Sequence, residues 1–117
     1  MISALIKQIK QKLRRISELR GNIDAIQQSL GRIEARQIYS LEPGDFAAAE
    51  FKVSSQFGED GIIEHLLRHV PIDRPIFIEF GVEDYAEANT RFLLRNRNWS
   101  GLVMDGSTDN MAKVRNE

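Results

Sequence analysis

The chain has 117 residues, of which 42% are hydrophobic and 28% charged, and it contains no cysteine. This length allows at most one ordinary domain, and the absence of cysteine excludes disulfides, thiolate metal sites and cysteine nucleophiles. The net charge of −1 hides an asymmetry, because residues 1–38 carry eight basic and three acidic residues whereas the remainder carries eight basic and fourteen acidic ones.

The acidic remainder of the chain would oppose the approach of phosphates, so the basic segment does not indicate nucleic-acid binding. No stretch reaches the roughly 18 apolar residues that a membrane span requires. The apolar run at the N-terminus is also too short for a signal peptide. We therefore expect a cytoplasmic protein.

Residues 1–38 are predicted to form one amphipathic, coiled-coil-like helix. Its apolar residues recur every three or four positions, with one irregularity, two consecutive three-residue steps that end at Leu19. Such a narrow stripe favours self-association or docking of a partner helix through residues 2–33. Packing on the chain's own domain and binding to a membrane surface remain alternatives. The apolar positions are Ile2, Ile6, Ile9, Leu13, Ile16, Leu19, Ile23, Ile26, Leu30 and Ile33.

Residues 39–54 have the turn-forming composition of a linker, and residues 55–117 alternate helix and strand. Ser55 is a candidate helix N-cap, and Pro71 should end that helix. Two short apolar runs, 75–80 and 101–105, are typical of strands buried on both sides, with a helix between them over 86–98. Ser107 or Thr108 can cap a last helix. The predicted fold class is α/β, with a right-handed parallel strand–helix–strand unit over about 76–106.

Polar residues follow both predicted strands at the edge where parallel sheets bind ligands. The first strand ends at Glu79, Phe80 and Gly81, and a glycine there allows close approach of a ligand. The second ends at Asp105 and Gly106, where a carboxylate can accept hydrogen bonds from both hydroxyls of a ribose. This spacing is compatible with NAD or S-adenosylmethionine (SAM).

The charge of the loop after the first strand distinguishes these two cofactors. A dinucleotide needs its pyrophosphate held at a glycine-rich helix start. Here Glu83, Asp84 and Glu87 occupy that place and would repel phosphates. SAM has no phosphate and carries a sulfonium cation, so the acidic loop favours SAM.

Four segments resemble the FkbM-type SAM-dependent methyltransferases: SQFGEDGII from Ser55, FIEFGVED from Phe77, EANTRFLL from Glu87 and WSGLVMDGS from Trp99. The resemblance covers about residues 51–110. It implies a class I Rossmann-like fold in which Glu79, Gly81 and Asp105 contact SAM. The family motifs are matched further at Gln56, Asp60, Asn89 and Thr90.

Together these considerations give a predicted SAM-binding set of Glu79, Phe80, Gly81, Asn89, Thr90, Asp105 and Gly106. The resemblance further implies methyl transfer to a hydroxyl of a sugar, glycan or related small molecule. The chain departs from the family pattern at Tyr85, where a closing glycine is usual, and at Gly106–Ser107, where proline is common. We expect the chain to be the N-terminal portion of a longer methyltransferase, with its catalytic base elsewhere and no methyl transfer by this portion alone.

The other constellations favour structural roles. His65 and His69 have metal-ligand spacing on a helix but lack an evident third ligand, so no metal site is predicted. Arg91, Arg95 and Arg97 are expected on a solvated face, and Trp99 at a helix–strand junction. The alternative function is a non-enzymatic oligomerisation or interaction module on a truncated Rossmann scaffold.

Overall fold

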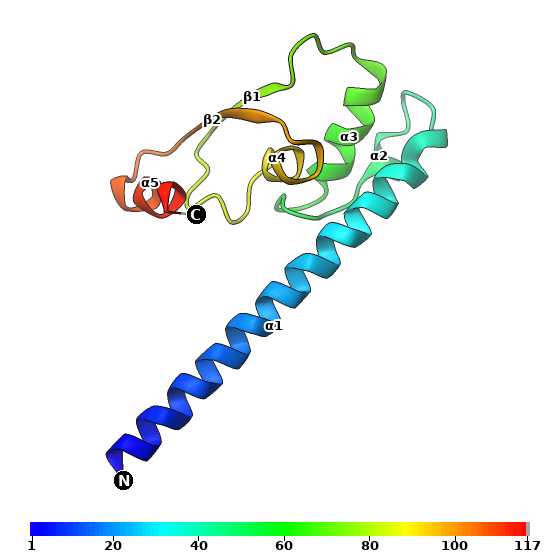
Figure 1. Ribbon diagram of the computed structural model, residues 1–117. Coiled ribbons are helices and arrows are strands. Elements are labelled where there is room, and N and C mark those ends of the chain that lie inside the picture. The colour runs from blue at the N-terminus through cyan, green and yellow to red at the C-terminus, as the bar shows by residue number, and fades with distance from the viewer. Residues whose placement is uncertain (117) are drawn as a thin grey trace.

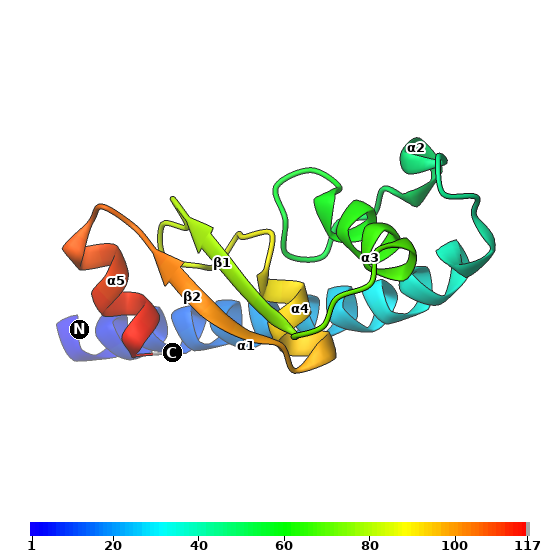
Figure 2. The same cartoon turned by 90° about the horizontal axis from the view of Figure 1, so that it is seen from above.

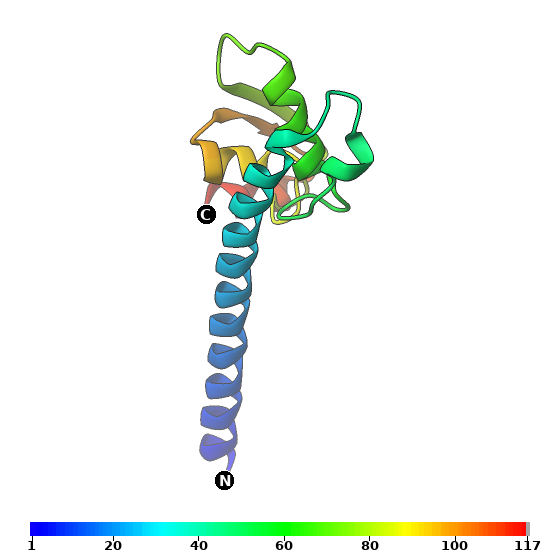
Figure 3. The same cartoon turned by 90° about the vertical axis from the view of Figure 1, so that its right-hand side faces the viewer.

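The computed structural model of the protein describes residues 1–116. A long helix carries a small α/β body at its C-terminal end, and its N-terminal part projects away from that body (Figure 1, Figure 3). This projection makes the molecule elongated, with extents of 63 × 31 × 21 Å. The elements are α1 (Ile2–Gln37), the 3-10 helix η1 (Ile38–Ser40), α2 (Phe46–Ala49), α3 (Glu59–His69), β1 (Ile76–Phe80), α4 (Arg91–Arg97), β2 (Ser100–Met104) and α5 (Thr108–Arg115).

The two strands form a parallel pair, as the sequence predicts. Phe77 lies opposite Gly101 and Phe80 opposite Met104, and α4 connects the two strands along the chain. The class of fold is therefore α/β, with a long N-terminal helix and a two-stranded parallel sheet. Within residues 1–116, no helix combines the length and apolar character needed to cross a membrane.

Only one face of the sheet is covered, although the apolar runs are typical of strands buried on both sides. Ile78 is 63% exposed and Phe80 is 75% exposed, and they share their open face with Ile76, Leu102 and Met104. Helix α4 lies behind the strands in Figure 2, on the side of the opposite face, and Val103 of that face packs near Met111 and Val114 of α5. Strand residues point alternately to the two faces, and two strands with helices on one side leave the other side open.

On the covered face, Phe77 is buried and packs closely against β2. A Cβ atom at Gly101 would lie 2.4 Å from a ring carbon of Phe77 and 2.3 Å from its carbonyl oxygen. Glycine at this position therefore allows the aromatic ring to lie flat over the neighbouring strand.

Two helix starts differ from the prediction. The helix expected at Ser55 begins at Glu59 with Gly58 as its N-cap, and the helix expected over 86–98 begins at Arg91. In both places, backbone N–H groups that donate to a carboxylate hold the preceding residues in a loop, as described below. Of the two candidate caps, Ser107 and Thr108, the N-cap of α5 is Ser107, whose side chain accepts a hydrogen bond from the backbone N–H of Asn110.

The main hydrophobic cluster joins the C-terminal end of α1 to the body. It contains Ile38, Ala49, Phe51, Val53 and Phe92. Three of these residues come from the segment 39–54, for which a linker is predicted, so this segment contributes to the core. Val82, Tyr85 and Ala88, which belong to the loop between β1 and α4, form a smaller hydrophobic cluster.

Two ion pairs tie α4 to other helices. Arg97 binds both carboxylate oxygens of the buried Glu64 on α3, with Nε 2.9 and 3.0 Å from them. This contact raises the pKa of Arg97. Arg95 contacts Asp24 of α1 at 2.8 Å in a more exposed pair. Arg97 is exposed, as predicted, but its guanidinium also neutralises the buried charge of Glu64.

We predict opposite effects on stability for alanine at the two glycines of α1. At Gly31 a Cβ atom would lie 2.3 Å from Val53 Cγ2 and 3.0 Å from Phe92 Cζ, whereas at Gly21 nothing lies within 4 Å. Gly21→Ala should raise helix stability by up to about 1 kcal/mol. Gly31→Ala should lower the free energy of unfolding by about 1 kcal/mol net, because overpacking outweighs the gain in helix propensity.

Urea unfolding followed by circular dichroism measures both variants. An increase in stability for Gly31→Ala equal to that for Gly21→Ala would contradict the close packing of α1 on the body.

Candidate functional site

The loop between β1 and α4 has an unusual backbone. Gly81, Glu83 and Tyr85 all have positive φ, at 73°, 51° and 63°. This left-handed conformation costs roughly 1–2 kcal/mol for a residue other than glycine. Tyr85 stands where the family resemblance expects a glycine, and its backbone adopts the conformation that glycine favours. Its buried ring and its hydroxyl, 3.0 Å from Thr90 Oγ1, hold it there.

Glu79, at the end of β1, fixes the other end of this loop. One carboxylate oxygen accepts the backbone N–H of Asn89 at 2.9 Å. The other accepts the N–H of Thr90 at 3.0 Å and the Thr90 hydroxyl at 2.5 Å. Because a carboxylate can only accept, Thr90 donates to Glu79 and Tyr85 donates to Thr90. Glu79 thus sets where α4 begins.

Asp105, just after β2, organises two turns. Its Oδ2 accepts the N–H of Glu83 at 2.9 Å, and its Oδ1 accepts the N–H of Ser107 at 2.8 Å. Oδ1 also contacts the side-chain amide of Asn110 at 3.3 Å. The backbone donors at Ser107 and Glu83 hold the pKa of the Asp105 carboxyl below its usual value. The group therefore stays charged at neutral pH.

The two carboxylates lie where the sequence predicts. Because β1 and β2 are parallel and in register, Glu79 and Asp105 lie at the same edge of the sheet, and strand alternation puts them on the same face. A carboxylate has about four acceptor positions, and each of these already accepts three hydrogen bonds. Asp105 therefore has one position left on Oδ2, which does not allow the predicted two-oxygen contact with a ribose unless an internal bond breaks.

The other predicted cofactor residues separate into three groups. Phe80 points to the open face of the sheet, away from Glu79, and Thr90 is buried in contact with Glu79 and Tyr85. Gly106 faces open space. Gly81 and Asn89, together with Glu79 but not Asp105, lie around a hollow of about 230 Å³, lined by Gln56, Glu79, Gly81, Glu83, Glu87, Ala88 and Asn89.

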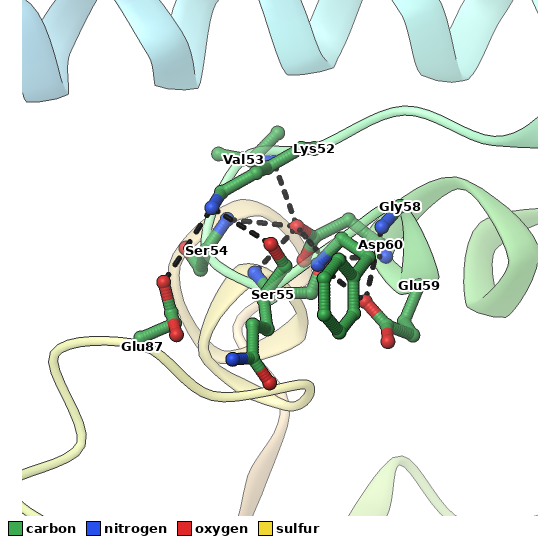
Figure 4. Close-up of polar contacts among 10 residues, drawn as sticks. Lys52, Val53, Ser54, Ser55, Gly58, Glu59, Asp60 and Glu87 are labelled. Atoms are coloured by element: carbon green, nitrogen blue, oxygen red, sulfur yellow. Dashed lines mark hydrogen bonds and ion pairs between the residues drawn. The ribbon is translucent and has the colours of Figure 1, made fainter.

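The Gln56 side of this hollow is built around the buried carboxylate of Asp60 (Figure 4). Its Oδ2 accepts three consecutive backbone N–H groups, those of Val53, Ser54 and Ser55, each at 2.7 Å. The Ser55 hydroxyl also donates to Oδ2, at 2.7 Å, and accepts the N–H of Asp60 at 3.1 Å. Ser55 is therefore not the N-cap of α3 but a partner of Asp60 in shaping the preceding loop.

Further contacts bring this loop beside the loop between β1 and α4. The backbone N–H of Ala88 donates to the carbonyl of Ser54 at 2.9 Å. Lys52 donates to the carbonyl of Gln56 at 2.8 Å and forms an ion pair with Glu87 at 3.4 Å (Figure 4). The hollow thus lies between two loops that are each folded around an internal carboxylate.

The remaining constellations are structural. His65 is fully buried beside His69, with ring centroids 4.7 Å apart, and its Nε2 contacts the carbonyl of Pro43. No group of three or more His, Cys, Asp and Glu residues suited to a metal occurs within the described part of the chain. Arg91 donates to the carbonyl of Tyr85, and Trp99 is half-buried between α4 and β2.

The sequence did not reveal that Glu79, Asp60 and Asp105 are bound internally. For Asp60, the sequence contains one indication of this role in Ser55, five residues earlier, because a hydroxyl and a carboxylate at this spacing can close a loop. The left-handed conformation of Tyr85 had no signal in the residue type, since tyrosine rarely adopts it.

Comparisons of the chain with protein-family models, with curated proteins and with solved structures gave no significant match. The case for a function therefore depends on the residues and geometry described above.

We predict that Asp60→Asn strongly destabilises the protein. The asparagine amide would face three buried backbone N–H donors either with its own N–H groups or with a neutral oxygen. A neutral oxygen accepts weaker hydrogen bonds than a carboxylate does. The free energy of unfolding should fall by about 3 kcal/mol or more. Glu59→Gln is the matched control, because Glu59 accepts the N–H groups of Phe57 and Gly58 in a more exposed setting. Equal effects of the two substitutions in urea unfolding would contradict the role given to Asp60.

Stability should also decline in acid. Backbone hydrogen bonds, chiefly from Phe57, lower the pKa of Glu59 below 4.5, and those from Ser107 and Glu83 lower the pKa of Asp105 below 3.8. The unfolded chain then binds more protons than the folded one, so stability is present above about pH 4.5 and is lost as the pH falls through the lowered folded values.

The measurement is the free energy of unfolding from pH 6 down to about pH 3. The Glu59→Gln and Asp105→Asn double variant should show a shallower decline. A slope as steep as that of the parent chain would show that these two carboxylates do not account for the effect.

Proposed function

We propose that this chain is the SAM-binding N-terminal part of a methyltransferase. The observation that carries the proposal is the pair of carboxylates, Glu79 and Asp105, at the carboxyl ends of adjacent parallel strands, with the open Gly81 beside them. In parallel sheets, ligands bind at this edge, and a carboxylate after the second strand can accept from a ribose hydroxyl. The free acceptor position on Asp105 Oδ2 is available for one such bond.

The charge of the hollow supports SAM over a dinucleotide. Glu79, Glu83 and Glu87 line it, and Lys52 neutralises part of this charge through Glu87. A sulfonium cation is attracted to such a surface, whereas a pyrophosphate is repelled. The backbone N–H groups of Glu83, Asn89 and Thr90, which a phosphate would need as donors, already donate to Asp105 and Glu79.

Each residue has a distinct part in this proposal. Gly81 leaves space for the backbone to approach the cofactor, since nothing lies within 4 Å of a Cβ built there. Glu79 fixes the loop, while the exposed side chains of Gln56 and Asn89 can bond polar groups of a ligand in the hollow. Methyl transfer itself depends on alignment of donor and acceptor, and the resemblance suggests a sugar or glycan hydroxyl as acceptor.

The size of the hollow limits what this chain does alone. Ligand sites usually measure about 300–1,000 Å³ and bury most of the ligand surface. A hollow of about 230 Å³ encloses only part of a SAM molecule. The exposed apolar sheet face, which includes Ile78 and Phe80, offers a surface on which further elements of a complete methyltransferase domain would pack.

We expect this chain to bind SAM weakly, with a dissociation constant of about 1 mM or higher, and to transfer no methyl groups. Amide chemical-shift titration measures this, and the shifts should be confined to residues 79–89 and 105–107. Asp105→Asn should weaken binding at least about tenfold, because a charge-assisted hydrogen bond is lost.

Asp109→Asn is the matched control, because it removes a neighbouring carboxylate in the first turn of α5 and should leave the titration unchanged. NAD is the control ligand and should give no saturable shifts. Shifts with NAD as large as those with SAM, or SAM shifts elsewhere in the chain, would refute the proposed site.

A further inference from the structure

The apolar stripe of α1 is exposed along its whole length. We call these ten residues the α1 seam, and each is between 47% and 75% exposed. Monomeric proteins rarely expose a continuous apolar patch larger than a few hundred Å². Ten half-exposed aliphatic side chains in one row approach the roughly 800 Å² that each partner contributes to an interface of standard size. The seam comprises Ile2, Ile6, Ile9, Leu13, Ile16, Leu19, Ile23, Ile26, Leu30 and Ile33.

The body packs on α1 without covering the seam. Its contacts fall on a second row of residues, Asp24, Gln28, Gly31, Ala35 and Ile38. With the seam as heptad positions a and d, this row occupies b and f. These are the outer positions of a coiled coil, so the body and a partner helix can bind α1 at the same time. The projection of α1 beyond the body leaves the seam accessible (Figure 1).

The twist of the seam distinguishes a partner helix from a membrane surface. Its ten positions complete nine turns in 31 residues, about 3.4 residues per turn, whereas an α-helix has 3.6. The seam therefore winds around α1 in a left-handed sense by about 140° over its length. A flat lipid surface can contact only part of such a stripe, whereas a helix in a left-handed supercoil follows all of it.

We propose that α1 assembles with a second copy of this chain as a parallel coiled coil, with the bodies on the outside at one end. A parallel second copy carries the irregularity, two three-residue steps from Leu13 through Ile16 to Leu19, at the same level, so the layers on both sides of it stay matched. The parallel arrangement also pairs all ten seam residues, whereas the antiparallel register that matches the same layers leaves Ile33 without a partner. Basic pairs do not decide the direction, because Arg15 faces Arg20 in the parallel arrangement and Lys10 faces Arg20 in the antiparallel one.

This assembly does not depend on SAM binding, and sedimentation tests it directly. The chain should sediment as an oligomer at micromolar concentrations, and Leu13→Asp should make it a monomer. Gln11→Asp is the matched control, because it places the same charge at an outer position two residues away and should leave the oligomer intact. The fluorescence of Trp99, the single tryptophan, reports that the body of each variant is folded.

Disulfide formation tests the direction of the helices, because the natural chain has no cysteine. Ile9→Cys should oxidise rapidly to a covalent dimer, and Gln11→Cys should not. A monomeric parent chain with a folded body would overturn the proposal, as would binding of monomers to anionic lipid vesicles through the seam. Failure of Ile9→Cys to crosslink, or equal crosslinking of Gln11→Cys, would exclude the parallel arrangement.

Discussion

The body of this protein depends on one carboxylate, that of Asp60. By accepting three consecutive backbone N–H groups, it forces residues 53–55 into a tight loop and joins them to the first turn of α3. That loop then places Val53 against Gly31 and Phe92, and the Ser54 carbonyl against Ala88. One buried charge therefore couples α1, α3 and the loop beside the candidate site, and the energy comes from donors that would otherwise be buried without partners.

Carboxylates that accept backbone N–H groups also shape the candidate site, where charged groups both support the loops and face the solvent. Glu79 and Asp105 use most of their acceptor capacity on backbone groups, which fixes the loop containing Glu83 and Tyr85 in a strained conformation. This arrangement forms a small acidic hollow before any ligand binds. The acceptor positions that a ligand could use are then mostly occupied by backbone N–H groups. A ligand at this edge therefore meets a rigid surface with few free acceptors, which favours recognition by charge and shape.

Helix α1 divides its surface between two tasks. Small and polar residues at Gly31 and Gln28 contact the body, whereas isoleucine and leucine form the seam on another side. Close packing of a helix on a loop requires a small residue, and a coiled coil requires large aliphatic ones. The ion pair of Asp24 with Arg95 belongs to the first task and fixes the orientation of α1 on the body.

Sequence alone determined the features set by local spacing: the helix 2–37, the two parallel strands, a cap at Ser107 or Thr108 and the common edge of Glu79 and Asp105. Hydrophobic period and strand order decide these features. Tertiary structure decided where α3 and α4 begin, because Asp60 and Glu79 bind backbone groups five to eleven residues away and so hold the residues before each helix in loops. It also decided that Tyr85 is left-handed, since this follows from which side chains meet across the chain, and residue spacing carries no record of that.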